Sequence, residues 1–235
     1  MNLFYSPDIT DSSTYRLSEE ESRHCARVLR MSEGDLLYLT DGCGTLYTAR
    51  LVDNSPKGCE VKIEHVEYYY RPRSYYLHVA VALTKNLDRY EWMLEKMTEI
   101  GVDEITPIIC EHSERRTWKS ERAEKILISA MKQSLKAYLP KLNNAVSFSD
   151  FVTQPFDGKI LIAHCREGEV APLSQAIQGE QKIMIVIGPE GDFSPQEIDL
   201  ALAAGYEAVN LGSSRFRTET AGILACATVC ALNQL

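Results

Sequence analysis

From residue 77 onwards, short apolar runs alternate with longer segments whose apolar residues recur at helical spacing. Each apolar run is too short for a typical helix but long enough for a buried strand. The predicted strands are residues 77–83, which are apolar except for His78, and residues 105–110, 159–163, 182–187 and 206–211. The segments with helical spacing are residues 88–100, 120–137, 194–205 and 220–232. Regular alternation of strands and helices predicts an α/β domain with a parallel sheet and right-handed crossovers.

Two of these helices carry signals for where they begin and end. Asp88 precedes the apolar stripe of its helix and Gly101 follows that stripe, so we expect Asp88 to cap the helix and Gly101 to end it. Ser194, Pro195 and Glu197 are the residue types preferred at the N-cap, first and third positions of a helix. Both helices are therefore expected to begin at these residues.

The first 70 residues have a different pattern, with short strands and one helix. Residues 36–40 and 46–52 flank a glycine-containing turn and predict a hairpin, and residues 59–67 alternate as a further strand. A tyrosine-rich connection follows. We therefore divide the chain into a small β-barrel-like domain at residues 1–70 and an α/β domain at residues 71–235.

The helix of the first domain begins with the spacing of a capping box, Ser18-x-x-Glu21. A regular helical period beyond it would place apolar and basic residues on opposite faces. The apolar face would carry Cys25, Val28 and Leu29, and the basic face Arg23, Arg27 and Arg30. Such a basic face is usually only solvated, but it is also a candidate for contact with phosphate.

Composition excludes several classes of protein. No apolar run approaches the roughly 18 residues of a membrane span, and we expect no secretory signal at the N-terminus. The 7 cysteines contain no C-x-x-C pair, which argues against a disulfide framework and a zinc ribbon and favours a cytoplasmic location. The net charge of −8 excludes a global basic field, so any binding of nucleic acid must depend on local patches.

Two glycine-containing loops follow apolar strands, at residues 187–194 and 211–221. Ligands of parallel α/β sheets bind at the carboxyl ends of strands, and glycines there let backbone amides approach a ligand. Neither loop has the spacing of a dinucleotide-binding or P-loop motif. Taken alone, each loop is better explained as a tight connection from strand to helix.

Five segments taken together resemble the ribosomal RNA small subunit methyltransferase E family of the SPOUT class of RNA methyltransferases. In chain order they are Arg23-His24-x-x-Arg27-Val28-Leu29-Arg30 with Gly34-Asp35, residues 96–102 with Pro107, Gln133-Ser134 with Pro140, Gly188-Pro189-Glu190-Gly191, and Leu211-Gly212 with Arg217-Thr218-Glu219-Thr220-Ala221. The resemblance covers nearly the whole chain in the same order. It implies a PUA-like β-barrel at residues 1–70 and a SPOUT methyltransferase domain, tied in a deep trefoil knot, at residues 71–235.

The resemblance also implies an activity. Members of this family methylate N3 of a uridine in 16S rRNA, with S-adenosylmethionine (SAM) as methyl donor and S-adenosylhomocysteine as product. The implied substrate is 16S rRNA or the 30S subunit, and the implied assembly is a homodimer. We expect no metal, no DNA partner and no membrane partner. The apolar final helix, residues 220–232, suits burial against a second copy.

Several residues are assigned to sites by the resemblance or by their charge. The expected SAM-binding residues are Leu161, His164, Ile187, Gly188, Pro189, Glu190, Gly191, Leu211, Gly212, Phe216, Arg217, Thr218, Thr220 and Ala221. The expected RNA-binding residues are Arg23, Arg27, Arg30, Arg115 and Arg116.

The chemistry selects two catalytic candidates. Uridine N3 carries a proton at neutral pH, so it becomes a nucleophile only when that proton leaves and the uracil anion is stabilised. Arg217 is the expected anion clamp, since its guanidinium stays charged. Glu219 is the expected proton acceptor, directly or through water, and capping the final helix or orienting Arg217 are its alternative roles.

The chain departs from the common family pattern at some positions. Asp192 stands where many members have a second glycine, so we expect no positive φ there. Ser213-Ser214 replaces Pro-Arg, and Arg215 follows one place later, which leaves the role of the usual arginine open. Lys132 stands where glutamate is common.

Two other functions stay open at this point. One is a SPOUT ribose 2′-O-methyltransferase, against which the motifs near Arg23 and Lys96 count. The other is an RNA-binding assembly protein that kept the fold without catalysis. SAM binding and the identity of the methylated nucleoside distinguish the three.

Overall fold

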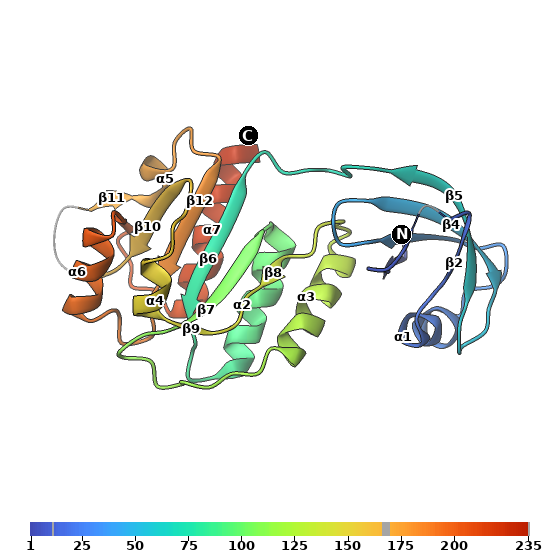
Figure 1. Cartoon of the computed structure of the whole chain (residues 1–235), viewed down its shortest axis with the longest axis horizontal. Helices are drawn as coiled ribbons and strands as arrows, with labels where there is room; N and C mark the ends of the chain where they lie inside the picture. The colour runs from blue at the N-terminus through green and yellow to red at the C-terminus, as the bar shows by residue number, and fades with distance from the viewer. Residues whose placement is uncertain (11, 166–169, 235) are drawn as a thin grey trace. The chain divides into compact units, whose positions relative to one another are not determined.

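The computed structural model describes residues 1–10, 12–165 and 170–234, which form two compact units (Figure 1). The first unit comprises Met1–Pro72 and Ile128–Leu139, and the second begins with Arg73–Leu127 and resumes at Pro140. The division at residue 70 places Ile128–Leu139 in the second domain, whereas the structure groups it with the first unit. Backbone hydrogen bonds explain this grouping. The carbonyl of Ala137 accepts from Gly44 N–H at 2.8 Å, and the carbonyl of Gly42 accepts from Leu139 N–H at 2.8 Å.

Five strands form one sheet in the first unit, in the order β1-β3-β4-β5-β2. They are β1 (Leu3–Tyr5), β2 (Thr14–Arg16), β3 (Leu36–Thr40), β4 (Leu46–Asp53) and β5 (Glu60–Glu67). The expected hairpin is confirmed, because β3 and β4 pair antiparallel with Thr40 opposite Leu46. Phe4, Leu37 and Val61 are fully buried in the core of this unit.

The helical segment of the first unit differs from the regular helix that we expected. Helix α1 (Glu19–Arg23) is followed directly by a π-helical turn, η1 (His24–Val28), and Arg30 has a φ of 52°. A π-helical turn closes over five residues, so the 3.6-residue period ends there. The prediction of an apolar face opposite a basic face is therefore wrong, because Cys25 is buried but Val28 is 67% exposed.

The capping box at the start of α1 is only half formed. The Ser18 side chain accepts a hydrogen bond from Glu21 N–H at 3.2 Å, as expected. The Glu21 carboxylate instead accepts from Tyr5 N–H at 3.2 Å and from Lys132 Nζ at 2.6 Å. Glu21 is 7% exposed, so its charge is neutralised inside the unit by a lysine distant in sequence.

The second unit is built on a sheet whose pairings are all parallel, in the order β11-β13-β10-β12-β6-β7-β8, with β9 also paired to β7. Its strands are β6 (Tyr76–Ala82), β7 (Glu104–Ile109), β8 (Lys141–Leu142), β9 (Val146–Ser147), β10 (Lys159–Ala163), β11 (Ala171–Pro172), β12 (Lys182–Ile187) and β13 (Glu207–Asn210). The predicted α/β class with a parallel sheet is confirmed. The short strands β8, β9 and β11 were not predicted, because none of them corresponds to an apolar run in the sequence.

Helices connect these strands. They are α2 (Leu87–Ile100), α3 (Glu121–Gln133), α4 (Phe148–Val152), α5 (Leu173–Ala176), α6 (Pro195–Ala203) and α7 (Thr218–Gln234). The predicted cap of α2 is wrong: Asn86 is the N-cap, and its side chain accepts from Asp88 N–H at 2.9 Å. Helix α3 ends before the expected residue 137, because Leu135 has a φ of 56°. The capping box of α6, from Ser194 and Glu197, is confirmed.

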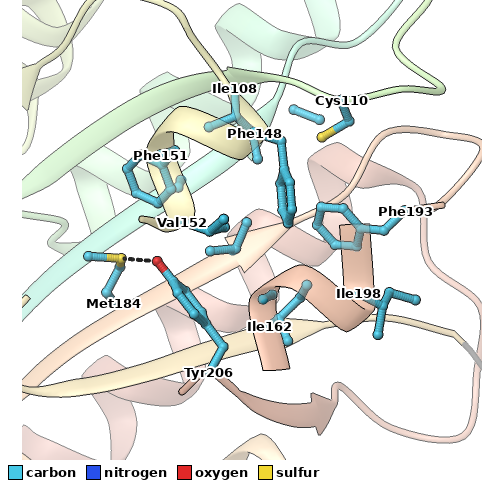
Figure 2. Close-up of a cluster of buried hydrophobic side chains, with 14 residues drawn as sticks. Ile108, Cys110, Phe148, Phe151, Val152, Ile162, Met184, Phe193, Ile198 and Tyr206 are labelled. Atoms are coloured by element: carbon cyan, nitrogen blue, oxygen red, sulfur yellow. Dashed lines mark hydrogen bonds between the residues drawn. The ribbon is translucent and has the colours of Figure 1, made fainter. Parts of the chain in front are cut away.

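Helices α4 and α6 cover one face of the sheet with a cluster of buried side chains (Figure 2). Phe148 and Phe193 lie with ring centroids 5.2 Å apart, and the Tyr206 hydroxyl contacts the Met184 sulfur at 3.4 Å. Helices α2 and α7 pack against each other. Their close approach requires Gly222, since a Cβ there would lie 2.7 Å from the Met93 sulfur. Across the described ranges, none of the helices is long and apolar enough to cross a membrane.

Candidate active site

Three loops of the second unit meet at one edge of the sheet. They follow strands β10, β12 and β13, which are neighbours and run parallel, so their carboxyl ends lie together. Between these loops is a cavity of about 620 Å³. A cavity at the carboxyl edge of a parallel sheet is the expected place for a ligand in this class of fold.

Most of the residues assigned to SAM line this cavity. They are His164, Ile187, Gly188, Pro189, Glu190, Leu211, Gly212, Phe216, Thr218 and Ala221. Four assigned residues lie outside the lining. Leu161 is fully buried within β10, Gly191 contacts His112, and Arg217 and Thr220 are exposed.

Other residues of the lining were not assigned from the sequence. They are Cys165, Val170, Asp192, Val209, Asn210, Ser213, Ser214 and Arg215. Val209 and Asn210 end strand β13, so the rule that ligands bind at the carboxyl ends of strands could have identified them. Arg215 brings a cation to the lining one place after the usual family position. No sequence signal pointed to Cys165 or Val170.

The loop after β12 is fixed by hydrogen bonds from other loops of the same edge. The Glu190 carboxylate accepts from Lys85 N–H at 3.0 Å, and the Thr218 hydroxyl donates to the carbonyl of Gly188 at 3.0 Å. His112 Nδ1 lies 3.2 Å from the carbonyl oxygen of Gly191. Because a carbonyl oxygen can only accept, His112 Nδ1 carries the proton here. These hydrogen bonds hold the backbone of this loop in place.

Asp192 has a φ of 62°, so the expectation of a negative φ at this position is wrong. Aspartate tolerates the left-handed region better than most residues because its short side chain can hydrogen-bond locally. Its Oδ1 accepts from Phe193 N–H at 2.9 Å and its Oδ2 from Cys165 N–H at 2.9 Å. These local bonds offset the strain that a glycine would avoid.

The two catalytic candidates lie beside the cavity rather than in its lining. Arg217 is exposed and stands between Phe216 and Thr218, which both line the cavity. Glu219 is only 7% exposed, and its carboxylate forms an ion pair with Arg89 at 3.8 Å. The cation paired with Glu219 is thus Arg89, in α2, rather than Arg217.

The candidate RNA-binding residues belong to both units. Arg23 forms an exposed ion pair with Glu19 at 3.3 Å, and Arg27 and Arg30 are exposed. In the second unit, Arg116 donates to the carbonyl of Glu111 at 3.1 Å and is exposed. The last candidate, Arg115, donates at 3.1 Å to the carbonyl of Lys85. Arg115 therefore has a structural role in the loop that also holds Glu190.

His78 and Glu104 are titratable groups with shifted pKa values within the sheet. His78 is 6% exposed and its Nε2 lies 2.7 Å from the Thr106 hydroxyl. Burial lowers the pKa of His78 from 6.5 to about 4. Burial acts to raise the pKa of Glu104, but hydrogen bonds from Asn143, Tyr76 and Lys141 lower it to about 2. Within the described part of the chain, no three His, Cys, Asp or Glu side chains are grouped as a metal site.

Comparisons with known proteins agree with this architecture. The family described as an RNA methyltransferase domain matches residues 71–230, and the one described as an RNA methyltransferase PUA domain matches residues 17–64. A protein named ribosomal RNA small subunit methyltransferase E, from Mesomycoplasma hyopneumoniae, is 30% identical over 75% of this chain and 78% of its own length.

Two crystal structures are similar over nearly their full lengths. One is a probable rRNA-methyltransferase from Porphyromonas gingivalis, 44% identical with a TM-score of 0.90, covering 100% of this chain and 99% of that chain. The other is a ribosomal RNA small subunit methyltransferase E from Neisseria gonorrhoeae bound to S-adenosyl methionine, 29% identical with a TM-score of 0.90, covering 99% of this chain and 98% of that chain. This chain therefore belongs to the RNA methyltransferase family and, within it, to the ribosomal RNA small subunit methyltransferase E family.

Proposed function

We propose that this protein transfers a methyl group from SAM to N3 of a uridine in 16S rRNA. The observation that carries the proposal is the cavity of about 620 Å³ formed by the loops after β10, β12 and β13. Two of these loops contain the motifs that resemble the family, and the gonococcal relative is bound to SAM. The names of the relatives support a ribosomal RNA substrate.

The lining of the cavity fits SAM. Its volume of about 620 Å³ lies within the usual range for sites of small molecules, roughly 300–1,000 Å³. Leu211 and Phe216 offer apolar surface for an adenine ring, and the carboxylates of Glu190 and Asp192 suit a positively charged ligand. When bound, SAM would supply a methyl group activated by its sulfonium.

The residues beside the cavity would prepare the uridine. Arg217 is exposed next to the lining, so its guanidinium can face the uracil edge and stabilise the anion that forms when N3 loses its proton. Glu219 is buried and paired with Arg89, which favours a role in holding the first turn of α7. As a proton acceptor, Glu219 would act through water.

The proposal extends to assembly and architecture. We include in the proposal a deep trefoil knot, a closed PUA-like barrel and a cytoplasmic location, and membership of the family supports all three. Ile223 and Leu224 of α7 are only half-buried in the single chain, which supports a homodimer in which this helix contacts a second copy. Light scattering at micromolar protein tests this part, and a monomer mass would contradict it.

Nucleoside mass spectrometry tests the activity. The purified protein is incubated with SAM and either free 16S rRNA or 30S subunits from cells that lack this modification. We expect 3-methyluridine to appear only when protein and SAM are both present. A 2′-O-methylated nucleoside would indicate the ribose methyltransferase instead. SAM binding without any methylation of either substrate would favour a non-catalytic RNA-binding protein.

A further inference from the structure

We propose that Asp192 is a positioning residue that joins two loops of the cavity and so sets the shape of the SAM site. This inference rests on the proposed function of the cavity. Asp192 lies in the loop after β12, and Cys165 lies in the loop after β10. Both residues line the cavity. A bond between them therefore spans the cavity wall rather than stabilising one loop alone.

The carboxylate of Asp192 uses both oxygens. Oδ2 accepts from Cys165 N–H at 2.9 Å, and Oδ1 accepts from Phe193 N–H at 2.9 Å. Hydrogen bonds to an ionised acceptor are roughly twice as strong as neutral ones. The bond to Phe193 fixes the direction of the carboxylate, and the bond to Cys165 holds the neighbouring loop against it.

The backbone of Asp192 is anchored as well. Its carbonyl oxygen lies 3.0 Å from His112 Nδ1, which donates from the loop after β7. Its φ of 62° lies in a region where few residues other than glycine are stable. A residue held in that region from two sides is a rigid point from which Oδ2 reaches Cys165. A glycine would relieve the backbone strain but would have no oxygen for Cys165.

The charge of Asp192 also suits the ligand. SAM carries a positive sulfonium, and a carboxylate in the lining lowers the free energy of a nearby cation. Burial raises the pKa of the Cys165 thiol, and Asp192 raises it further. Cys165 therefore stays neutral near the carboxylate and leaves the negative charge of Asp192 without a competing thiolate.

Two substitutions separate these contributions. Asp192→Gly removes both acceptors and relieves the backbone strain. Asp192→Asn tolerates the same backbone but keeps only one acceptor oxygen and no charge. Asp157→Gly is the matched control, because its side chain is fully exposed and lies just before β10, at the amino ends of the strands. Thermal unfolding checks that each variant is folded.

The measurements are SAM affinity by calorimetry and hydrogen exchange of the Cys165 amide by NMR without ligand. We expect the Kd for SAM to rise about tenfold or more in Asp192→Gly and by less in Asp192→Asn. The Cys165 amide should exchange about tenfold faster in Asp192→Gly, in proportion to the lost hydrogen bond. In turnover assays KM for SAM should rise while kcat at saturating SAM changes little, since Asp192 acts through the loop. Asp157→Gly should match the wild type throughout.

The outcomes are distinguishable. If the wild type fails to bind SAM, the proposed function is wrong and the role of Asp192 falls with it. If the wild type binds SAM and Asp192→Gly binds it equally tightly, only the positioning role is overturned. Unchanged exchange of the Cys165 amide in Asp192→Gly also overturns it, because the bond to Cys165 would then not restrain the loop.

Discussion

Acid should destabilise the second unit through His78, which lies at the centre of the sheet. Burial lowers the pKa of His78 to about 4, against 6.5 for an exposed histidine. The unfolded chain therefore binds a proton at a higher pH than the folded chain does. Stability from the neutral imidazole is fully present above pH 6.5 and is lost as the pH falls from 6.5 to 4.

The size of the effect follows from these two values. A tenfold difference in proton affinity corresponds to about 1.4 kcal/mol, so the full loss below pH 4 is about 3 kcal/mol. About 2 kcal/mol of it should already be lost at pH 5. At pH 5 the Glu104 carboxylate, whose pKa is about 2, is still ionised. The comparison of pH 7.5 with pH 5 therefore reports mainly on the histidine.

Urea unfolding followed by tryptophan fluorescence measures this loss. Both tryptophans, Trp92 and Trp118, lie in the second unit, so the signal reports on that unit. His78→Gln keeps a polar side chain near the Thr106 hydroxyl but cannot titrate. We expect the wild type to lose about 2 kcal/mol more than this variant between pH 7.5 and pH 5. Equal losses in the two proteins would refute the argument from burial.

Three further substitutions test other parts of the structure. Gly191→Val should weaken SAM binding in calorimetry while the protein stays folded, because a Cβ at Gly191 would lie 3.1 Å from the His112 Cβ and displace the loop that His112 holds. Unchanged affinity for SAM would show that this loop is not part of the SAM site. Lys132→Ala leaves the buried carboxylate of Glu21 without its cation, and it should lower the free energy of unfolding, followed by circular dichroism, by about 3 kcal/mol. Adding Glu21→Gln should recover much of this stability, and no recovery would contradict the pairing. Arg217→Ala should slow single-turnover methylation about a hundredfold while SAM affinity is kept; chemistry near the wild-type rate would remove Arg217 from the catalytic step.

The strands of the second unit could be predicted because their burial appears directly in the sequence. Residues 77–83 are apolar except for His78, and residues 183–187 are continuously apolar; both segments became central parallel strands, β6 and β12. Strands of two residues, such as β8 and β9, contain too few side chains to make a pattern. The end of α3 was also hidden, since it depends on the left-handed conformation of Leu135 rather than on a helix-breaking residue type.

The first unit shows a second limit of periodicity. Ser18 correctly marks where α1 begins, because a cap depends on one side chain and nearby backbone. The π-helical turn at His24–Val28 changes the period within one element, and nothing in the residue types announces it. The exposure of Val28 follows from that turn. A prediction that assumes a constant helical period therefore placed Val28 on the buried face by mistake.

The candidate site could be located from its motifs because each motif follows a strand. The bonds between the loops could not, since they depend on which strands are neighbours. Glu190 reaches Lys85 N–H because β12 lies beside β6, and Asp192 reaches Cys165 N–H because β12 also lies beside β10. The same motifs on a sheet with β12 at one edge would meet only one of these partners. The insertion of β12 between an early and a late strand of the unit therefore makes one rigid cavity from loops that the sequence shows only as separate turns.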